Sequence, residues 1–94
     1  MYVLRIEHSV PSYQSWKQAF DSDPVNRKKM GVRHFRIYRA VDNKNNVLLD
    51  LEFDSEDQAN ALLGALKTLW GRVEGTLMSD VRTRILEQVE ESTL

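Results

Sequence analysis

The chain has 94 residues, of which 13 are basic and 14 acidic, giving a formal net charge of −1 at pH 7, and it contains no cysteine. A chain of this length forms one domain, residues 1–94, that buries about two thirds of its unfolded surface, so a mixed second face often needs a partner. The balanced charge argues against the overall basic field of nonspecific nucleic-acid binding, and the absence of thiols excludes cysteine catalysis, disulfides and cysteine-ligated metals.

The N-terminal third predicts a strand, a helix and a short turn. Residues 2–8 alternate apolar and mostly charged side chains, which is typical of a half-buried strand. Pro11 or Ser12 can open a helix with a bulky stripe at helical spacing, formed by Tyr13, Trp16, Ala19 and Phe20. Asp23 followed by Pro24 then predicts a short helical turn that ends at Gly31. The basic residues at the C-terminal end of this turn complement the helix dipole there. In the alternative interpretation, Arg27, Lys28 and Arg33 form an anion-binding rim.

The middle of the chain predicts a hairpin that leads into a second helix. Residues 32–41 form one strand, residues 42–46 a polar turn, and the next strand alternates between apolar and mostly acidic faces. The apolar face of this later strand holds Val47, Leu49, Leu51 and Phe53, and the other holds Leu48, Asp50, Glu52 and Asp54. Ser55 and Gln58 then fit a capping box, in which each bonds to the backbone N–H of the other.

The C-terminal part predicts a helix, a loose segment and a final strand. The apolar stripe of the helix comprises Ala59, Leu62, Leu63, Leu66 and Trp70, and Gly71 or Gly75 can end it. Residues 81–90 alternate again, with Val81, Ile85 and Val89 on one face. Residues 90–94 are expected to be a tail or an extension exchanged with another chain.

This order of elements predicts an α+β fold of the ferredoxin-like split βαβ type, βαββαβ, with the first and third strands at the centre. Both helices cover one face of the antiparallel sheet, and the helix-free face mixes charge with apolar side chains. There Asp50 and Glu52 are expected to lie beside Arg5 and Arg36 as cross-strand ion pairs. Packing two such faces together in a homodimer would close a barrel whose interior charges are paired.

Five segments carry a family resemblance: VLRIEH, YQSWKQAF, RKKMGVRHFRIYRA, LLDLEFDSEDQA and RTRILEQVE. With them the chain resembles the dimeric α+β barrel superfamily, which includes antibiotic biosynthesis monooxygenase-like, EthD-like and small polyketide cyclase-like proteins. The resemblance covers nearly the whole chain and implies a homodimer with a pocket between helices and sheet or inside the barrel. Members range from cofactorless oxygenases to proteins without known activity, so fold alone assigns no reaction.

The resemblance suggests a cofactorless monooxygenase-like or cyclase-like enzyme that acts on a small aromatic or polyketide-type molecule. The candidate catalytic residues are His34 as acid or base, with His8 as the other histidine, and Tyr38 and Arg36 to position substrate and stabilise an oxyanion. Trp16 and Glu52 are the candidate substrate-binding residues, although Trp16 also fits the core. The alternative is a noncatalytic homodimeric ligand-binding or interaction module, in which the charged face only specifies the partner sheet.

Other classes of function find less support. A metal site of His8, His34 and Glu52 has suitable ligand types but no close motif spacing, so we expect neither metal nor cofactor. An RNA-binding sheet would need aromatic residues where Asp50 and Glu52 stand, so we expect no nucleic-acid partner. An ACT-like regulatory domain stays possible by topology. No apolar run reaches the roughly 20 residues of a membrane span, and there is no signal-peptide core, which predicts a cytoplasmic protein without membrane contact.

Overall fold

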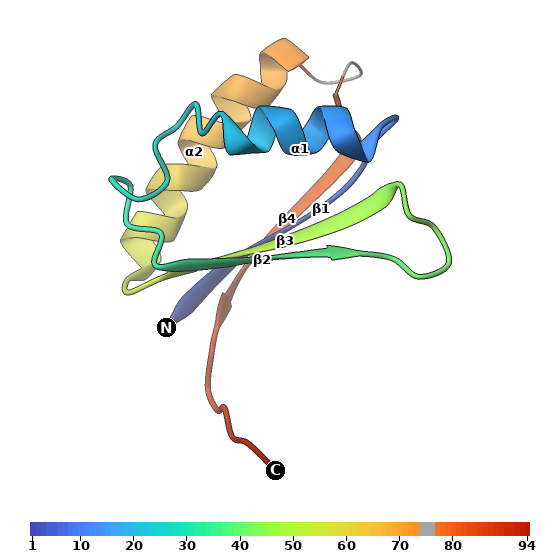
Figure 1. Ribbon diagram of the computed structural model, residues 1–94. Helices are drawn as coiled ribbons and strands as arrows, with labels where there is room; N and C mark the ends of the chain where they lie inside the picture. The colour runs from blue at the N-terminus through green and yellow to red at the C-terminus, as the bar shows by residue number, and fades with distance from the viewer. Residues whose placement is uncertain (74–76) are drawn as a thin grey trace.

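The computed structural model describes residues 1–73 and 77–94, which form a four-stranded antiparallel sheet with both helices on one face (Figure 1). The elements in chain order are β1 (Tyr2–Ser9), α1 (Tyr13–Asp21), β2 (His34–Arg39), β3 (Asn46–Phe53), α2 (Glu56–Val73) and β4 (Ser79–Glu87). The strand order is β2-β3-β1-β4, so the first and third strands are central. The predicted ferredoxin-like βαββαβ fold is therefore confirmed.

Both helices begin at the predicted serine caps. The Ser12 hydroxyl accepts a hydrogen bond from the Ser15 N–H at 3.2 Å, and the Ser55 hydroxyl accepts one from the Gln58 N–H at 3.2 Å. Each bond satisfies an N–H that the helix itself cannot pair. Only half of the predicted capping box forms, because the Gln58 side chain lies against Gly31 and makes no hydrogen bond back to Ser55.

The predicted short helical turn after α1 forms only in part: residues 22–25 form irregular turns, and one helical turn follows, in which the Met30 N–H donates to the Asn26 carbonyl at 3.1 Å. It ends at Gly31 as predicted, where the Val32 N–H donates to the Arg27 carbonyl at 3.0 Å. Asp23 has φ 52° and Asn26 has φ 54°, whereas a helix cap is extended and a helix interior is right-handed. The Asp23 carboxylate instead accepts a hydrogen bond from the Arg27 N–H at 2.9 Å. The left-handed residues Asp23 and Asn26 confine the helical conformation to the single turn that follows them, and the chain then returns toward β2.

Gly31 closes these turns with φ 102°, a conformation that a residue with a Cβ adopts only under strain. A Cβ there would also lie 2.7 Å from the Gln58 side-chain Cδ. We expect Gly31→Ala to lower the free energy of unfolding by about 1–2 kcal/mol, measured by urea denaturation. Gly64→Ala is the matched control: Gly64 lies within α2 with open space around it, so this variant should gain up to about 1 kcal/mol. Equal stability of the two variants would contradict the expectation.

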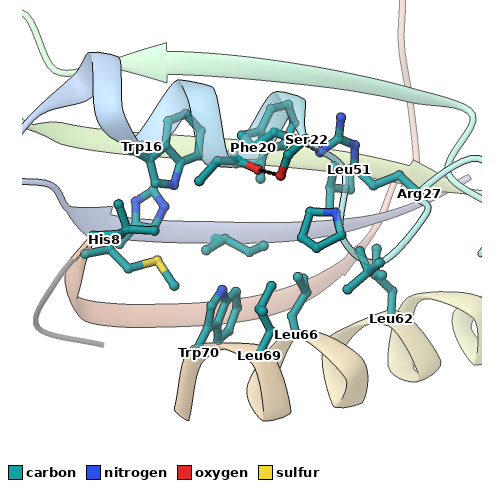
Figure 2. A pocket seen from close by; sticks show the side chains of 17 residues that line it. His8, Trp16, Phe20, Ser22, Arg27, Leu51, Leu62, Leu66, Leu69 and Trp70 are labelled. Atoms are coloured by element: carbon teal, nitrogen blue, oxygen red, sulfur yellow. Dashed lines mark hydrogen bonds between the residues drawn. The ribbon is translucent and has the colours of Figure 1, made fainter. Parts of the chain in front are cut away.

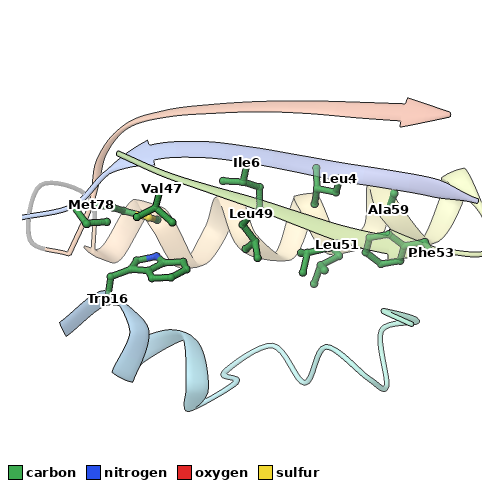
Figure 3. Packing of buried hydrophobic residues seen from close by; sticks show 11 residues of the cluster. Leu4, Ile6, Trp16, Val47, Leu49, Leu51, Phe53, Ala59 and Met78 are labelled. Atoms are coloured by element: carbon green, nitrogen blue, oxygen red, sulfur yellow. The ribbon is translucent and has the colours of Figure 1, made fainter. Parts of the chain in front are cut away.

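The core lies between the sheet and the helices, and its largest contribution comes from β3 (Figure 3). The apolar face of β3 is fully buried, as its alternation predicted, and it packs beside the apolar face of β1. The buried hydrophobic residues are Leu4, Ile6, Val10, Trp16, Val47, Leu49, Leu51, Phe53, Ala59, Leu62 and Met78. Only Trp16 comes from α1, so α2 supplies the closer cover of the sheet.

Three predicted boundaries differ from the structure. The second strand is shorter than residues 32–41, and because it is an edge strand, Phe35 on its helix-facing side stays 47% exposed. Helix α2 continues through Gly71, so the first predicted stop is wrong, and Gly75 lies outside the described residues. The last strand ends at Glu87, and Val89 beyond it is exposed.

The C-terminal residues after β4 run away from the sheet as an irregular extension (Figure 1). The Gln88 N–H donates to the Met1 carbonyl at 2.9 Å, which ties the start of this extension to the start of β1. No helix within residues 1–73 and 77–94 is long and apolar enough to cross a membrane.

Candidate functional site

The structure distributes the five predicted site residues between the two faces of the sheet. Four of them lie on the face of the sheet that points away from the helices: His34, Arg36 and Tyr38 on β2, and Glu52 on β3. His34 and Glu52 are directly opposite each other in the β2–β3 register. Trp16 lies on the opposite face, buried between α1 and the sheet. The three residues predicted to be catalytic and Glu52 can therefore share a site, but Trp16 cannot belong to that site within one chain.

The helix-free face contains the two predicted ion pairs. Arg5 donates from Nε and Nη2 to the two oxygens of Asp50, each at 2.8 Å, and Arg36 donates from Nη1 to Glu52. Asp50 and Glu52 are only 7% and 8% exposed, whereas the side chains of both arginines are about half exposed. Hydrogen bonds to these carboxylates and their negative charge raise the pKa of Arg5 and of Arg36. This polar face is thus filled by fixed charge pairs.

A pocket of about 300 Å³ lies on the other face, between α1, α2 and the sheet. It exists because α1 stands away from the sheet: no Cα of α1 comes within 8 Å of a Cα in any described strand. Figure 2 shows Trp16 and Phe20 of α1 facing Leu62, Leu66, Leu69 and Trp70 of α2 across this space. The lining is mostly aromatic and aliphatic, as in sites that bind small apolar molecules.

His8 lies at one end of the pocket and is only 2% exposed. Its Nδ1 is 3.2 Å from the Val47 carbonyl oxygen, and its ring meets the Trp16 ring edge to face at 5.1 Å. Because a carbonyl can only accept, we assign the hydrogen to Nδ1, which leaves Nε2 with a lone pair. Burial lowers the pKa of His8, against the opposing effect of its backbone hydrogen bonds. The ring is therefore neutral at pH 7 and can accept a proton.

Arg27 lies at the opposite end of the pocket (Figure 2). Its Nη1 donates to the Phe20 carbonyl at 2.7 Å, and its guanidinium carbon lies 3.7 Å from the centre of the Phe20 ring. The sequence suggested Arg27 for an anion-binding rim but did not place it in this pocket, because its position depends on the left-handed residues Asp23 and Asn26. The signal for His8 was present: on β1 it shares the apolar face with Leu4 and Ile6, where a polar side chain is unexpected.

The alternative metal site is not supported by the geometry. His8 points toward the helices, whereas His34 and Glu52 lie on the helix-free face, so the three cannot converge on one ion. The part of the chain that the structure describes contains no group of three or more histidine, aspartate or glutamate side chains placed to hold a metal.

No protein-family model matches the chain, and no curated protein matches it in sequence. Among solved structures, SnoaB, a cofactor-independent oxygenase from Streptomyces nogalater, has 14% identity and a TM-score of 0.72, covering 96% of this chain and 94% of that one. A dimeric ferredoxin-like protein from an uncultured marine organism has 15% identity and a TM-score of 0.67, covering 97% of each chain. A Deinococcus radiodurans protein, provisionally assigned as an antibiotic biosynthesis monooxygenase, has 11% identity and a TM-score of 0.69, covering 100% and 98%. At these identities the likenesses show the fold alone, and they confirm the predicted similarity in fold to antibiotic biosynthesis monooxygenase-like proteins.

Proposed function

We propose that the protein is a small monooxygenase-like or cyclase-like enzyme that binds an aromatic molecule in the pocket between its helices and sheet. The observation that carries this proposal is the pocket itself, an apolar space of about 300 Å³ with a buried, neutral histidine at one end. Similarity of fold to SnoaB, a cofactor-independent oxygenase, agrees with this assignment.

His8 is the proposed base, in place of His34. Monooxygenation without a cofactor and cyclisation of a polyketide-type chain can both begin by removing a proton from an activated C–H or O–H group. A neutral imidazole in an apolar pocket suits that step, because its basic nitrogen is free at pH 7. In the oxygenase reaction the substrate supplies the electrons: an activated CH₂ group becomes a carbonyl, one atom of O₂ enters the product and the other leaves as water.

We also propose that two copies associate through the helix-free face. The solved dimeric ferredoxin-like protein has the same fold, and this face carries half-exposed guanidinium groups beside nearly buried carboxylates. A second sheet would cover Arg5, Arg36 and Tyr38 and complete the barrel. In this assignment the residues first considered catalytic support the dimer, and the chemistry takes place on the opposite face of each sheet.

The test first measures whether the pocket binds an aromatic probe and then whether the protein converts a substrate. N-phenyl-1-naphthylamine, an uncharged aromatic amine that fluoresces in apolar surroundings, should bind at micromolar concentration, and Ala19→Trp should abolish binding by filling the pocket. Ala61→Trp is the matched control, because Ala61 is exposed on α2 and does not line the pocket. Turnover is then measured as oxygen uptake at an oxygen electrode, without added metal or cofactor. The candidate substrates are phenols, hydroquinones and enolisable aromatic ketones.

Binding that Ala19→Trp removes, together with oxygen uptake, supports the enzyme. If the probe binds in the same way but the panel consumes no oxygen and mass spectrometry finds no cyclised product, the noncatalytic ligand-binding module becomes the better assignment. Absence of probe binding to the wild-type protein would contradict both.

A further inference from the structure

The two ends of the pocket differ in charge. Between His8 at one end and Arg27 at the other, the lining consists mainly of leucine, tryptophan and phenylalanine side chains. His8 is neutral at pH 7 because burial lowers its pKa, whereas the guanidinium of Arg27 stays charged. A ligand that fills the pocket therefore meets a fixed positive charge at only one of its two ends.

Arg27 forms a longer and weaker ion pair than Arg5 does. Its nearest acidic oxygen, on Asp23, is 3.5 Å from Nε, whereas Arg5 makes two bonds of 2.8 Å to Asp50. Within residues 1–73 and 77–94 no acceptor is bonded to its Nη2, although its side chain is only 16% exposed. A largely buried cation with weak neutralisation attracts an anion, and the planar guanidinium can bind an oxyanion through two parallel hydrogen bonds.

The surface beside Arg27 also favours the approach of anions. An open hollow that Arg27 shares with the pocket is lined by Lys28, Lys29 and Arg33. Among the described residues, Arg33 is the one of these three that forms an ion pair, with Asp54 at 2.7 Å. Asp23 and Asp54 are the carboxylates that line this hollow. Four cations and two carboxylates leave a positive potential at this end, which raises the local concentration of anionic ligands.

We propose that the ligand of this protein is an amphipathic anion: a flat apolar body in the pocket, carrying an oxyanion group that binds Arg27. This inference rests on the proposed function and specifies its substrate class, namely aromatic acids or other aromatic compounds with an oxyanion at the edge of the ring system. Arg27 is then the specificity-determining residue, and it orients the opposite end of the ligand toward His8.

The test compares two probes that share one apolar body. 1-Anilinonaphthalene-8-sulfonate carries a sulfonate that N-phenyl-1-naphthylamine lacks, and both are followed by fluorescence titration of the full-length protein. We expect the sulfonate to bind roughly 10- to 100-fold more tightly, as one charge-assisted contact in a buried site would give. Arg27→Gln should remove this advantage and leave the binding of the uncharged amine unchanged, whereas Arg27→Lys should keep part of it.

Lys28→Gln is the matched control, because it removes one charge from the same surface but does not line the pocket. It should weaken sulfonate binding by less than about threefold, because an exposed charge contributes little to binding affinity. Equal affinity for the two probes, or equal losses in Arg27→Gln and Lys28→Gln, would overturn the oxyanion assignment and leave the pocket intact. Failure of both probes to bind the wild-type protein would overturn the proposed pocket, and this inference with it. Binding of the uncharged amine to Arg27→Gln shows that the variant is folded.

Discussion

Replacing Asp50 by asparagine should dissociate the proposed dimer and lower its free energy of unfolding by about 3–5 kcal/mol, the cost of removing one partner from a buried ion pair. In register, Asp50 lies between Arg36 and Arg5, and Arg5 lies beside Arg84 on β4. Asparagine keeps the shape of the side chain but leaves this row with three guanidinium groups and no carboxylate. Native mass spectrometry measures the number of subunits, and urea denaturation at a fixed protein concentration measures the free energy.

Asp21→Asn provides the matched control for this change. Asp21 pairs with Lys17 at 2.6 Å on the exposed surface of α1, so its loss should cost no more than about 0.5 kcal/mol and leave the subunit number unchanged. The double variant Arg5→Met, Asp50→Leu removes both charges together and should recover most of the lost stability. A stable dimer of Asp50→Asn with wild-type stability would show that this face is not the buried interface.

The ion pairs could be predicted from the sequence because they depend on two regular features only. Alternation along β3 places Asp50 and Glu52 on one face, and the βαββαβ order makes β3 the neighbour of both β1 and β2. The same two features correctly placed Leu49, Leu51 and Phe53 in the core. Where the alternation of side chains along a strand and the order of the strands determine which residues are neighbours, individual contacts can be predicted from the sequence.

The pocket could not be predicted in this way, because it depends on the distance between elements. A helical stripe containing Trp16 and Phe20 fits a close-packed helix as well as one held away from the sheet by its aromatic rings. Arg27 reaches the pocket because Asp23 and Asn26 are left-handed, whereas the sequence suggested that Asp23 and Pro24 open a regular helical turn. A position at the end of the predicted first strand favours a structural role for His8, so the sequence does not single out this histidine as the base.

His8→Asn should lower turnover of a reactive substrate by about 10²- to 10⁴-fold, the usual contribution of a positioned general base. Asparagine can still donate a hydrogen bond to the Val47 carbonyl but has no basic nitrogen, so the binding of N-phenyl-1-naphthylamine should change less than about threefold. His34→Asn discriminates between the two histidines, because His34 is exposed on the opposite face of the sheet. Initial rates of oxygen uptake, measured beside probe affinity, separate loss of chemistry from loss of the pocket.

The pH dependence of the wild-type rate gives an independent check on His8. The proposed base works only when neutral, and burial lowers the pKa of His8 below its ordinary value of about 6.5. Activity should therefore stay level as the pH falls through about 6.5 and decline only in more acidic solution, where the ring gains a proton. A decline centred at or above that value, or a large loss of turnover in His34→Asn while His8→Asn stays active, would instead assign the base to the helix-free face. The site would then lie inside the barrel between the two sheets, and the pocket beneath the helices would have only a binding or structural role.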